Sequence, residues 1–147
     1  MIIYTIGFTQ KSAETFFETL RKLYVKILID VRLFNSTQLA GFAKKNDLKY
    51  FLKAICNCDY IHCVNYAPTK KILEDYKKEK ITWKDYELQY KILMDERKAV
   101  KDFITCFNEI YDSVCLLCAE PTPEHCHRRL FAELIAEKLD DVEIIHL

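Results

Sequence analysis

Residues 116–136 read LLCAEPTPEHCHRRLFAELIA, and this stretch decides the fold class. It begins with a short apolar run of the kind that forms a buried strand. A turn with two prolines follows, after which apolar residues recur at helical spacing. A strand, a turn and an amphipathic helix in direct succession indicate one unit of a parallel sheet covered by helices.

The same alternation extends over the rest of the chain. The expected strands cover residues 2–6, 26–31, 60–64, 114–118 and 142–146. Helices are expected at residues 12–24, 47–55, 69–80 and 124–139. Residues 82–111 should form either one long helix or two helices with a break near 95–98, and an irregular loop is expected at 33–42. The sequence therefore predicts a single domain, 1–147, with a three-layer, Rossmann-like α/β fold and a mostly parallel sheet of about five strands.

The start of the last helix can be predicted in more detail. Thr122 is a good N-cap, and Pro123 suits the first helical position. Counting from there places Cys126 inside the helix and turns Arg128 toward the sheet, with Arg129 on the outer face. The two neighbouring arginines are thus expected to differ in their surroundings.

The composition excludes some classes of protein. Lys plus Arg and Asp plus Glu each number 22, so no overall positive field attracts nucleic acid or an anionic membrane. Seven cysteines, an odd number, with no basic and apolar leader at the N-terminus, favour reduced thiols in the cytoplasm. No apolar run is long enough to span a membrane, and there is no Gly-rich phosphate loop or G-x-S-x-G elbow.

Candidate functional residues follow three of the expected strands. Ligands of open α/β sheets bind beyond the carboxyl ends of the strands, so these residues should meet in one crevice. They are Gly7 and Thr9 after the first strand, Asp30 and Arg32 at the end of the second, and Cys118 and Glu120 at the end of the fourth. Cys126, His127 and Arg128 would approach the same crevice from the last helix.

Three stretches of the sequence resemble the DUF488 family, small bacterial and archaeal α/β proteins of uncharacterised function. They are YTIGFT at 4–9, LIDVR at 28–32 and, most specifically, residues 116–136. The resemblance implies the α/β fold and places family signature positions at Cys118, Glu120, Cys126, His127 and Arg128, with Gly7, Thr9, Asp30 and Arg32 as supporting positions. The chain departs from the family in the loop after the second strand, which reads LFNSTQ where relatives often carry proline and several arginines.

We expect an enzyme that acts on a small anionic substrate, a nucleotide or nucleic acid. Arg32, Arg128 and backbone N–H groups would hold a phosphate. His127 would transfer protons, and Glu120 would orient it or act as a base. Cys118 or Cys126 would be the nucleophile or a redox-active thiol, because a cation beside a thiol stabilises the thiolate.

Two other hypotheses are open. Cys118, Cys126 and His127, with Glu120 or His125, could bind zinc. This reading fits less well because Cys126 and His127 are adjacent in the expected helix, where their side chains diverge by about 100°. Alternatively, these residues belong to a non-enzymatic ligand-binding or regulatory module, and the sequence specifies no cofactor.

The remaining notable residues have less specific patterns. Trp83, Tyr86 and Tyr90 recur at helical spacing, which is typical of core packing but also suits a base-stacking platform or a homodimer interface. Cys106 and Cys115 are expected to be buried and inert. Cys56, Cys58 and Cys63 lie near His62, but their spacing matches no usual zinc motif.

Overall fold

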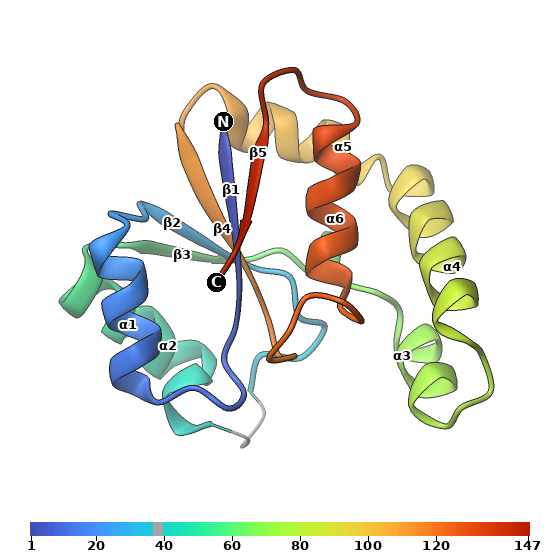
Figure 1. Ribbon diagram of the computed structural model, residues 1–147, viewed down its shortest axis with the longest axis horizontal. Helices are drawn as coiled ribbons and strands as arrows, with labels where there is room; N and C mark the ends of the chain where they lie inside the picture. The colour runs from blue at the N-terminus through green and yellow to red at the C-terminus, as the bar shows by residue number, and fades with distance from the viewer. Residues whose placement is uncertain (37–39) are drawn as a thin grey trace.

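The computed structural model describes residues 1–36 and 40–147 and contains one five-stranded sheet with helices on both sides (Figure 1). The strands are β1 (Ile2–Gly7), β2 (Ile27–Asp30), β3 (Asp59–His62), β4 (Ser113–Cys118) and β5 (Glu143–His146). The α-helices are α1 (Ala13–Lys22), α2 (Lys45–Phe51), α3 (Lys70–Lys77), α4 (Trp83–Glu96), α5 (Ala99–Phe103) and α6 (His127–Ala136). Short 3-10 helices lie at Gly41–Ala43 and Val64–Tyr66, and π-helical turns at Leu52–Cys56 and Ile104–Asn108.

The strands are all parallel and lie in the order β3-β2-β4-β1-β5. This confirms the predicted fold class. The register pairs Gly7 with Cys118 and Asp30 with Leu117, so the carboxyl ends of β1, β2 and β4 meet at one edge of the sheet. The chain leaves β2 toward β3 and leaves β4 in the opposite direction, toward β5. The gap between the ends of β2 and β4 is therefore the topological switch point, where open α/β sheets bind ligands.

Alternate residues of the strands enter two separate cores. Leu116 and Cys118 face the side covered by α5 and α6, on which α4 packs, whereas Cys115 and Leu117 face α1 and α2. Figure 1 shows α3 and α4 lying outside α6, farther from the sheet. The alternation follows from the two-residue period of a strand, and it puts Cys115 and Cys118 on opposite faces, so they cannot act as a C-x-x-C pair.

Most predicted helix boundaries agree with the structure. Ser12 caps α1 by accepting a hydrogen bond from the backbone of Thr15. The long helical stretch is broken where predicted, because Lys98 adopts a left-handed conformation (φ 52°) between α4 and α5. Residues 37–39 of the expected irregular loop lie outside the described part of the chain.

The predicted start of the last helix was wrong. α6 begins at His127, and its N-cap is Cys126 rather than Thr122. Cys126 has an extended backbone (φ −139°, ψ 135°), and its N–H donates to the carbonyl of Pro123 in a separate turn. The extended backbone of Cys126 interrupts helical geometry after that turn, so the helix begins only at His127.

Over residues 1–36 and 40–147, each helix is either too short or too polar to cross a lipid bilayer.

Candidate functional site

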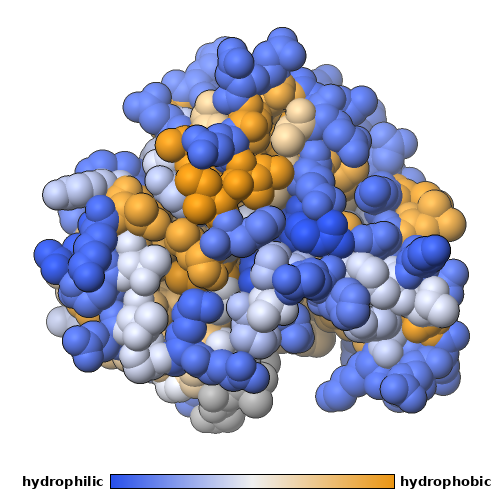
Figure 2. Space-filling model, in the orientation of Figure 1, coloured by the Kyte–Doolittle hydropathy of each residue, from blue (hydrophilic) through white to orange (hydrophobic). Residues whose placement is uncertain are grey.

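A pocket of about 390 Å³ opens at the switch point. Figure 2 shows a hollow between the lobe formed by α3 with the start of α4 and the rest of the molecule. The lining residues come from the ends of β2 and β4, from α3 and α4, and from the start of α6. They are Arg32, Leu33, Phe34, Leu73, Tyr76, Trp83, Tyr86, Cys118, Ala119, Glu120, His125, Cys126 and His127.

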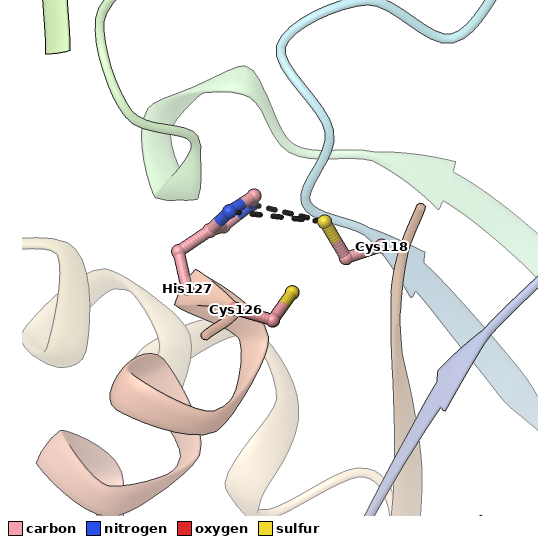
Figure 3. Close-up of side chains that lie close together, drawn as sticks. All are labelled: Cys118, Cys126 and His127. Carbon is pink, nitrogen blue, oxygen red and sulfur yellow. Dashed lines mark hydrogen bonds between the residues drawn. The ribbon is translucent and has the colours of Figure 1, made fainter. Parts of the chain in front are cut away.

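Three potential ligands or nucleophiles converge in this pocket. The Sγ atoms of Cys118 and Cys126 and a ring nitrogen of His127 all lie within 4.8 Å of one another, and all three residues are buried. Figure 3 shows their side chains directed toward one another from the end of β4 and the start of α6. The extended backbone of Cys126 makes this possible, since two successive helical residues would point in different directions.

The imidazole of His127 is fixed by a backbone carbonyl. Nε2 lies 2.8 Å from the carbonyl oxygen of Val31, which can only accept, so Nε2 carries a proton. Nδ1 lies 3.4 Å from the hydroxyl of Tyr86 and 3.7 Å from Cys118 Sγ. Because Nε2 is also 3.7 Å from that sulfur, neither nitrogen points directly at it. In the neutral ring, Nδ1 is therefore the nitrogen that carries the free lone pair.

The two thiols of the pocket differ in acidity. A hydrogen bond from Cys126 lowers the pKa of Cys118 against the effect of burial, assisted by the backbone N–H of Ala119, by Arg128 and by the backbone N–H of Glu120. Burial and the neighbouring Cys118 sulfur raise the pKa of Cys126. The arrangement therefore favours a thiolate on Cys118 and a protonated, donating thiol on Cys126.

Arg128 lies behind the thiols rather than in the pocket wall. Its side chain is fully buried, and Nη1 donates to the carbonyl of Glu120 at 2.7 Å and to Cys126 Sγ at 3.2 Å. Its Nε and Nη2 atoms have no hydrogen-bond partner in the described part of the chain, where no carboxylate forms an ion pair with this guanidinium. The thiol pair is thus the group that can supply the negative charge next to it.

Arg129 has a different environment, although it is less exposed than predicted. Its side chain is 22% exposed and forms ion pairs with Glu87 of α4 and Glu133 of α6, both at 2.7 Å. It therefore ties α4 to α6 on the outside of the molecule.

Asp30 and Arg32 form a buried ion pair beside the pocket. Arg32 donates from Nε and Nη2 to the two oxygens of Asp30 at 2.8 and 2.7 Å, and Nη2 also donates to the carbonyl of Ala43. Tyr60 donates to the same carboxylate at 2.7 Å. Arg32 contributes to the pocket lining, but its charge is already balanced; Asp30 is fully buried and outside the lining.

Gly7 and Thr9 support the loop that carries Glu120. A Cβ atom at position 7 would lie 1.7 Å from the carbonyl oxygen of Glu120, so the close passage of the two chains requires glycine. Thr9 donates to the carbonyl of Ala119 from both its side chain, at 2.7 Å, and its backbone, at 3.2 Å. Neither residue is part of the pocket lining.

The sequence did not identify the aromatic wall of the pocket as part of the site. The ring planes of Trp83 and Tyr86 are stacked, with centroids 4.7 Å apart, and Tyr76 and His125 contact this pair. The helical spacing of Trp83 and Tyr86 suits core packing, a base-stacking platform or a dimer interface, and His125 is predicted only as an alternative zinc ligand. Tyr76 belongs to no pattern that marks a site. Tyr90 is fully buried, so the inner face of this helix is not available to a second protein chain.

The other cysteines lie elsewhere in the molecule. All seven are free thiols; Cys115 is buried as predicted, whereas Cys106 is exposed, contrary to prediction, because its position on the π-helical turn faces solvent. Among the described residues, the cluster of potential metal ligands is the one formed by Cys118, Cys126 and His127, without Cys56, Cys58 or Cys63.

A comparison with protein families found one match. The model described as "Domain of unknown function DUF488" matches residues 12–135 of the 147, which is most of the chain and includes the whole thiol and histidine cluster. Searches among curated proteins and among solved structures found no match.

Proposed function

The chain belongs to the DUF488 family, and we propose that this member of it is a thiol-dependent enzyme whose nucleophile is Cys118. The observation that carries the proposal is the fully buried guanidinium of Arg128, which donates to the Cys126 thiol and, in the described part of the chain, forms no ion pair with a carboxylate. An uncompensated buried charge costs several kcal/mol, so a thiolate beside Arg128 stabilises the fold as well as activating the sulfur.

The contacts of the pocket define a role for each residue. Arg128 donates to Cys126, which polarises its S–H bond and strengthens its hydrogen bond to the Cys118 thiolate. His127 lies beside Cys118 and is held by the Val31 carbonyl, and a turn of its ring would let Nδ1 take the thiol proton of Cys118. This arrangement is the nucleophile and oriented-base pair of covalent catalysis, with a backbone carbonyl as the orienting group.

The reaction class follows from these roles. The Cys118 sulfur attacks an electrophilic carbon of the bound substrate, forming an S–C bond while the bond from that carbon to the leaving group breaks with its electron pair. The imidazolium of His127 returns the proton from Nδ1 to the leaving group, and attack by water on the covalent intermediate releases the product and the thiol. The S–C contact requires the substrate to enter beside the aromatic wall, where Cys118 lines the pocket.

Of the substrate class that the sequence predicts, the structure supports a nucleotide base better than a phosphate group. A planar base of a nucleotide suits the aromatic wall. A phosphate has less support, because Arg128 lies outside the pocket lining and Arg32 is paired with Asp30. Nucleotides therefore belong in a substrate screen together with other planar molecules.

The pH dependence of thiol alkylation tests the proposal. Iodoacetamide labelling of the folded protein, followed by mass spectrometry of peptides, gives a rate for each cysteine between pH 5 and 10. We expect Cys118 to reach its half-maximal rate at a lower pH than Cys106, an exposed thiol of the same chain. The pH midpoint reports the acidity of each thiol, whereas the absolute rate also depends on how easily iodoacetamide reaches it, so the midpoints are compared.

Two arginine variants provide a matched control. Arg128→Met should move the midpoint of Cys118 upward, whereas Arg129→Met should leave it unchanged; Arg128→Lys retains a charge if the methionine variant does not fold. Coincident midpoints for Cys118 and Cys106 in the unaltered protein, or no labelling of Cys118 at any pH, would refute the thiolate nucleophile.

A second candidate function is metal binding by Cys118, Cys126 and His127. It is favoured by the convergence of three ligand atoms within 4.8 Å and by the bond from Nε2 to the Val31 carbonyl, which is how metal-binding histidines are commonly oriented. The Nδ1 to Cys118 Sγ distance of 3.7 Å is close to the separation of about 3.6 Å that tetrahedral zinc imposes. The ring would still have to turn, since neither nitrogen points at the sulfur.

Native mass spectrometry of protein purified without chelator distinguishes the two functions. A mass increase of one zinc ion that is lost in Cys118→Ser would establish the metal centre and eliminate the free nucleophile. The metal-free mass, unchanged after incubation with zinc chloride and buffer exchange, would eliminate the metal centre.

A further inference from the structure

We infer that the pocket binds a planar heteroaromatic cation, of the pyridinium type, against the aromatic wall formed by Tyr76, Trp83, Tyr86 and His125. The inference rests on the proposed function only in placing the substrate in the same pocket. It concerns non-covalent recognition and names the class of molecule that the reactive thiol would meet.

The first step of the argument is the shape and composition of the wall. Apolar and aromatic side chains dominate the lining, and the stacked Trp83 and Tyr86 rings continue through Tyr76, whose centroid lies 5.5 Å from that of Trp83 and 5.4 Å from that of Tyr86. Rings of this kind present their electron-rich faces to planar or cationic groups. The volume of about 390 Å³ suits a small molecule and is too small for a macromolecular segment of any length.

The second step is the balance of charge around the pocket. The charge of Arg32 is already compensated by Asp30, and the guanidinium of Arg128 lies behind the thiols, outside the pocket lining. Glu120 is the carboxylate of the lining, and no hydrogen bond or ion pair within residues 1–36 and 40–147 engages its side chain. The pocket therefore presents an uncompensated negative charge to its contents.

The third step is the position of that charge relative to the rings. Glu120, Trp83 and Tyr86 all line the same pocket, so the carboxylate and the aromatic wall face the same contents. A cation stacked on the wall would be attracted by the Glu120 carboxylate, whereas an anion would be repelled by it. Electrostatics and stacking thus select the same kind of ligand.

Three related probes that share one ring but differ in charge test the inference. 1-Methylnicotinamide is a pyridinium cation, nicotinamide is the neutral ring and nicotinate is the anion. Trp83 is the one tryptophan of the chain, so quenching of its fluorescence reports binding at the wall, and calorimetry confirms the stoichiometry. We expect saturable binding of the cation, about tenfold tighter than nicotinamide, with nicotinate weakest.

Matched variants locate the two contributions. Glu120→Gln should reduce the preference for the cation over nicotinamide to about twofold or less, whereas Glu109→Gln, on the exposed end of the π-helical turn, should not change it. Tyr76→Leu should weaken both ligands together. Tightest binding by nicotinate, or a linear and non-saturating response to all three probes, would overturn the inference.

A variant of Cys118 distinguishes failure of this inference from failure of the proposed function. Cys118→Ser should retain cation binding, since recognition needs no covalent bond. Cation binding with an ordinary Cys118 alkylation profile would leave the inference standing without the nucleophile. An acidic Cys118 without cation binding would leave the nucleophile and refute the inference.

Discussion

Because Gly7 has no side chain, two backbone segments of the site can lie in direct contact. The carbonyl of Glu120 occupies the space that a Cβ at position 7 would need, at a distance of 1.7 Å, and both partners are backbone. The end of β1 and the loop after β4 can approach this closely because residue 7 is glycine. The role of Gly7 is therefore to position the Glu120 loop.

Gly7→Ala should lower the free energy of unfolding by at least about 3 kcal/mol, because backbone must move to admit the methyl group. The other glycine of the chain provides the control. A Cβ at Gly41 would have no neighbour within 4 Å among residues 1–36 and 40–147, so Gly41→Ala should change stability by less than about 0.5 kcal/mol. Urea unfolding followed by circular dichroism measures both. Equal effects of the two substitutions would show that the backbone of the Glu120 loop can move to admit the methyl group at little energetic cost.

The sequence named some of the residues that line the pocket, but it did not define their environments. Cys118, Glu120, Cys126 and His127 follow a buried strand or precede a helix, and all four line the pocket. That Arg128 contacts a thiol instead of facing the pocket depends on the depth at which α6 packs against the sheet. Periodicity along one helix contains no information about that depth.

At the scale of elements, the loop before α6 is the instructive case. Thr122 had every feature of an N-cap, yet the helix begins five residues later. The conformation of Cys126 is determined by tertiary contacts, since its sulfur lies between Cys118 and Arg128. A cap signal in the sequence describes a local preference, which these contacts override.

Two threonines that look alike in sequence should therefore respond differently to substitution. Thr82→Ala removes a capping box at the start of α4 and should cost about 1 kcal/mol. Thr122→Ala removes no helix cap and should cost less than about 0.5 kcal/mol. Chemical denaturation measures the free energy of unfolding of both variants. A loss for Thr122→Ala as large as that for Thr82→Ala would mean that the turn before α6 stabilises the helix.

The strands and most helices were predicted because their patterns are local. Buried strands appear as short apolar runs, and the capped helices α1 and α4 begin immediately after Ser12 and Thr82. The aromatic wall could not be predicted in the same way. Whether Trp83 and Tyr86 face a core or a cavity depends on how α3 and α4 pack over the end of β4, which brings together segments far apart in sequence.

For the molecule as a whole, the buried thiols should make the free energy of unfolding decrease as the pH rises into the alkaline range. Burial raises the pKa of Cys58 to about 12, and it raises the pKa of Cys63 to about 12 as well. In the unfolded chain a thiol loses its proton near pH 8.5, whereas in the folded protein Cys58 keeps it. Below about pH 8.5 both states are protonated and stability is unaffected; above it, the unfolded state is favoured increasingly until the folded thiol also ionises.

The free energy of unfolding should consequently fall by about 1.4 kcal/mol per pH unit for each such thiol above pH 8.5. Between pH 7.5 and 10, Cys58→Ala should lose about 2 kcal/mol less than the unaltered protein, because the variant lacks this titration. Urea titrations with reductant at both pH values measure the difference. Cys106→Ala, which removes an exposed thiol, should match the unaltered protein; a Cys58→Ala curve parallel to both would contradict the linkage.

The strand order has a consequence for how the chain is made. β1 and β2 are consecutive in sequence but do not pair; β4, synthesised some eighty residues after β2, must enter between them. During synthesis the ribosome therefore releases two separate apolar strands whose common neighbour does not yet exist, and such unpaired edges promote aggregation. Cys118 and His127 arrive with that late strand and the helix after it, so the nascent chain can assemble its thiol and histidine cluster only once β4 is available to join β1 to β2.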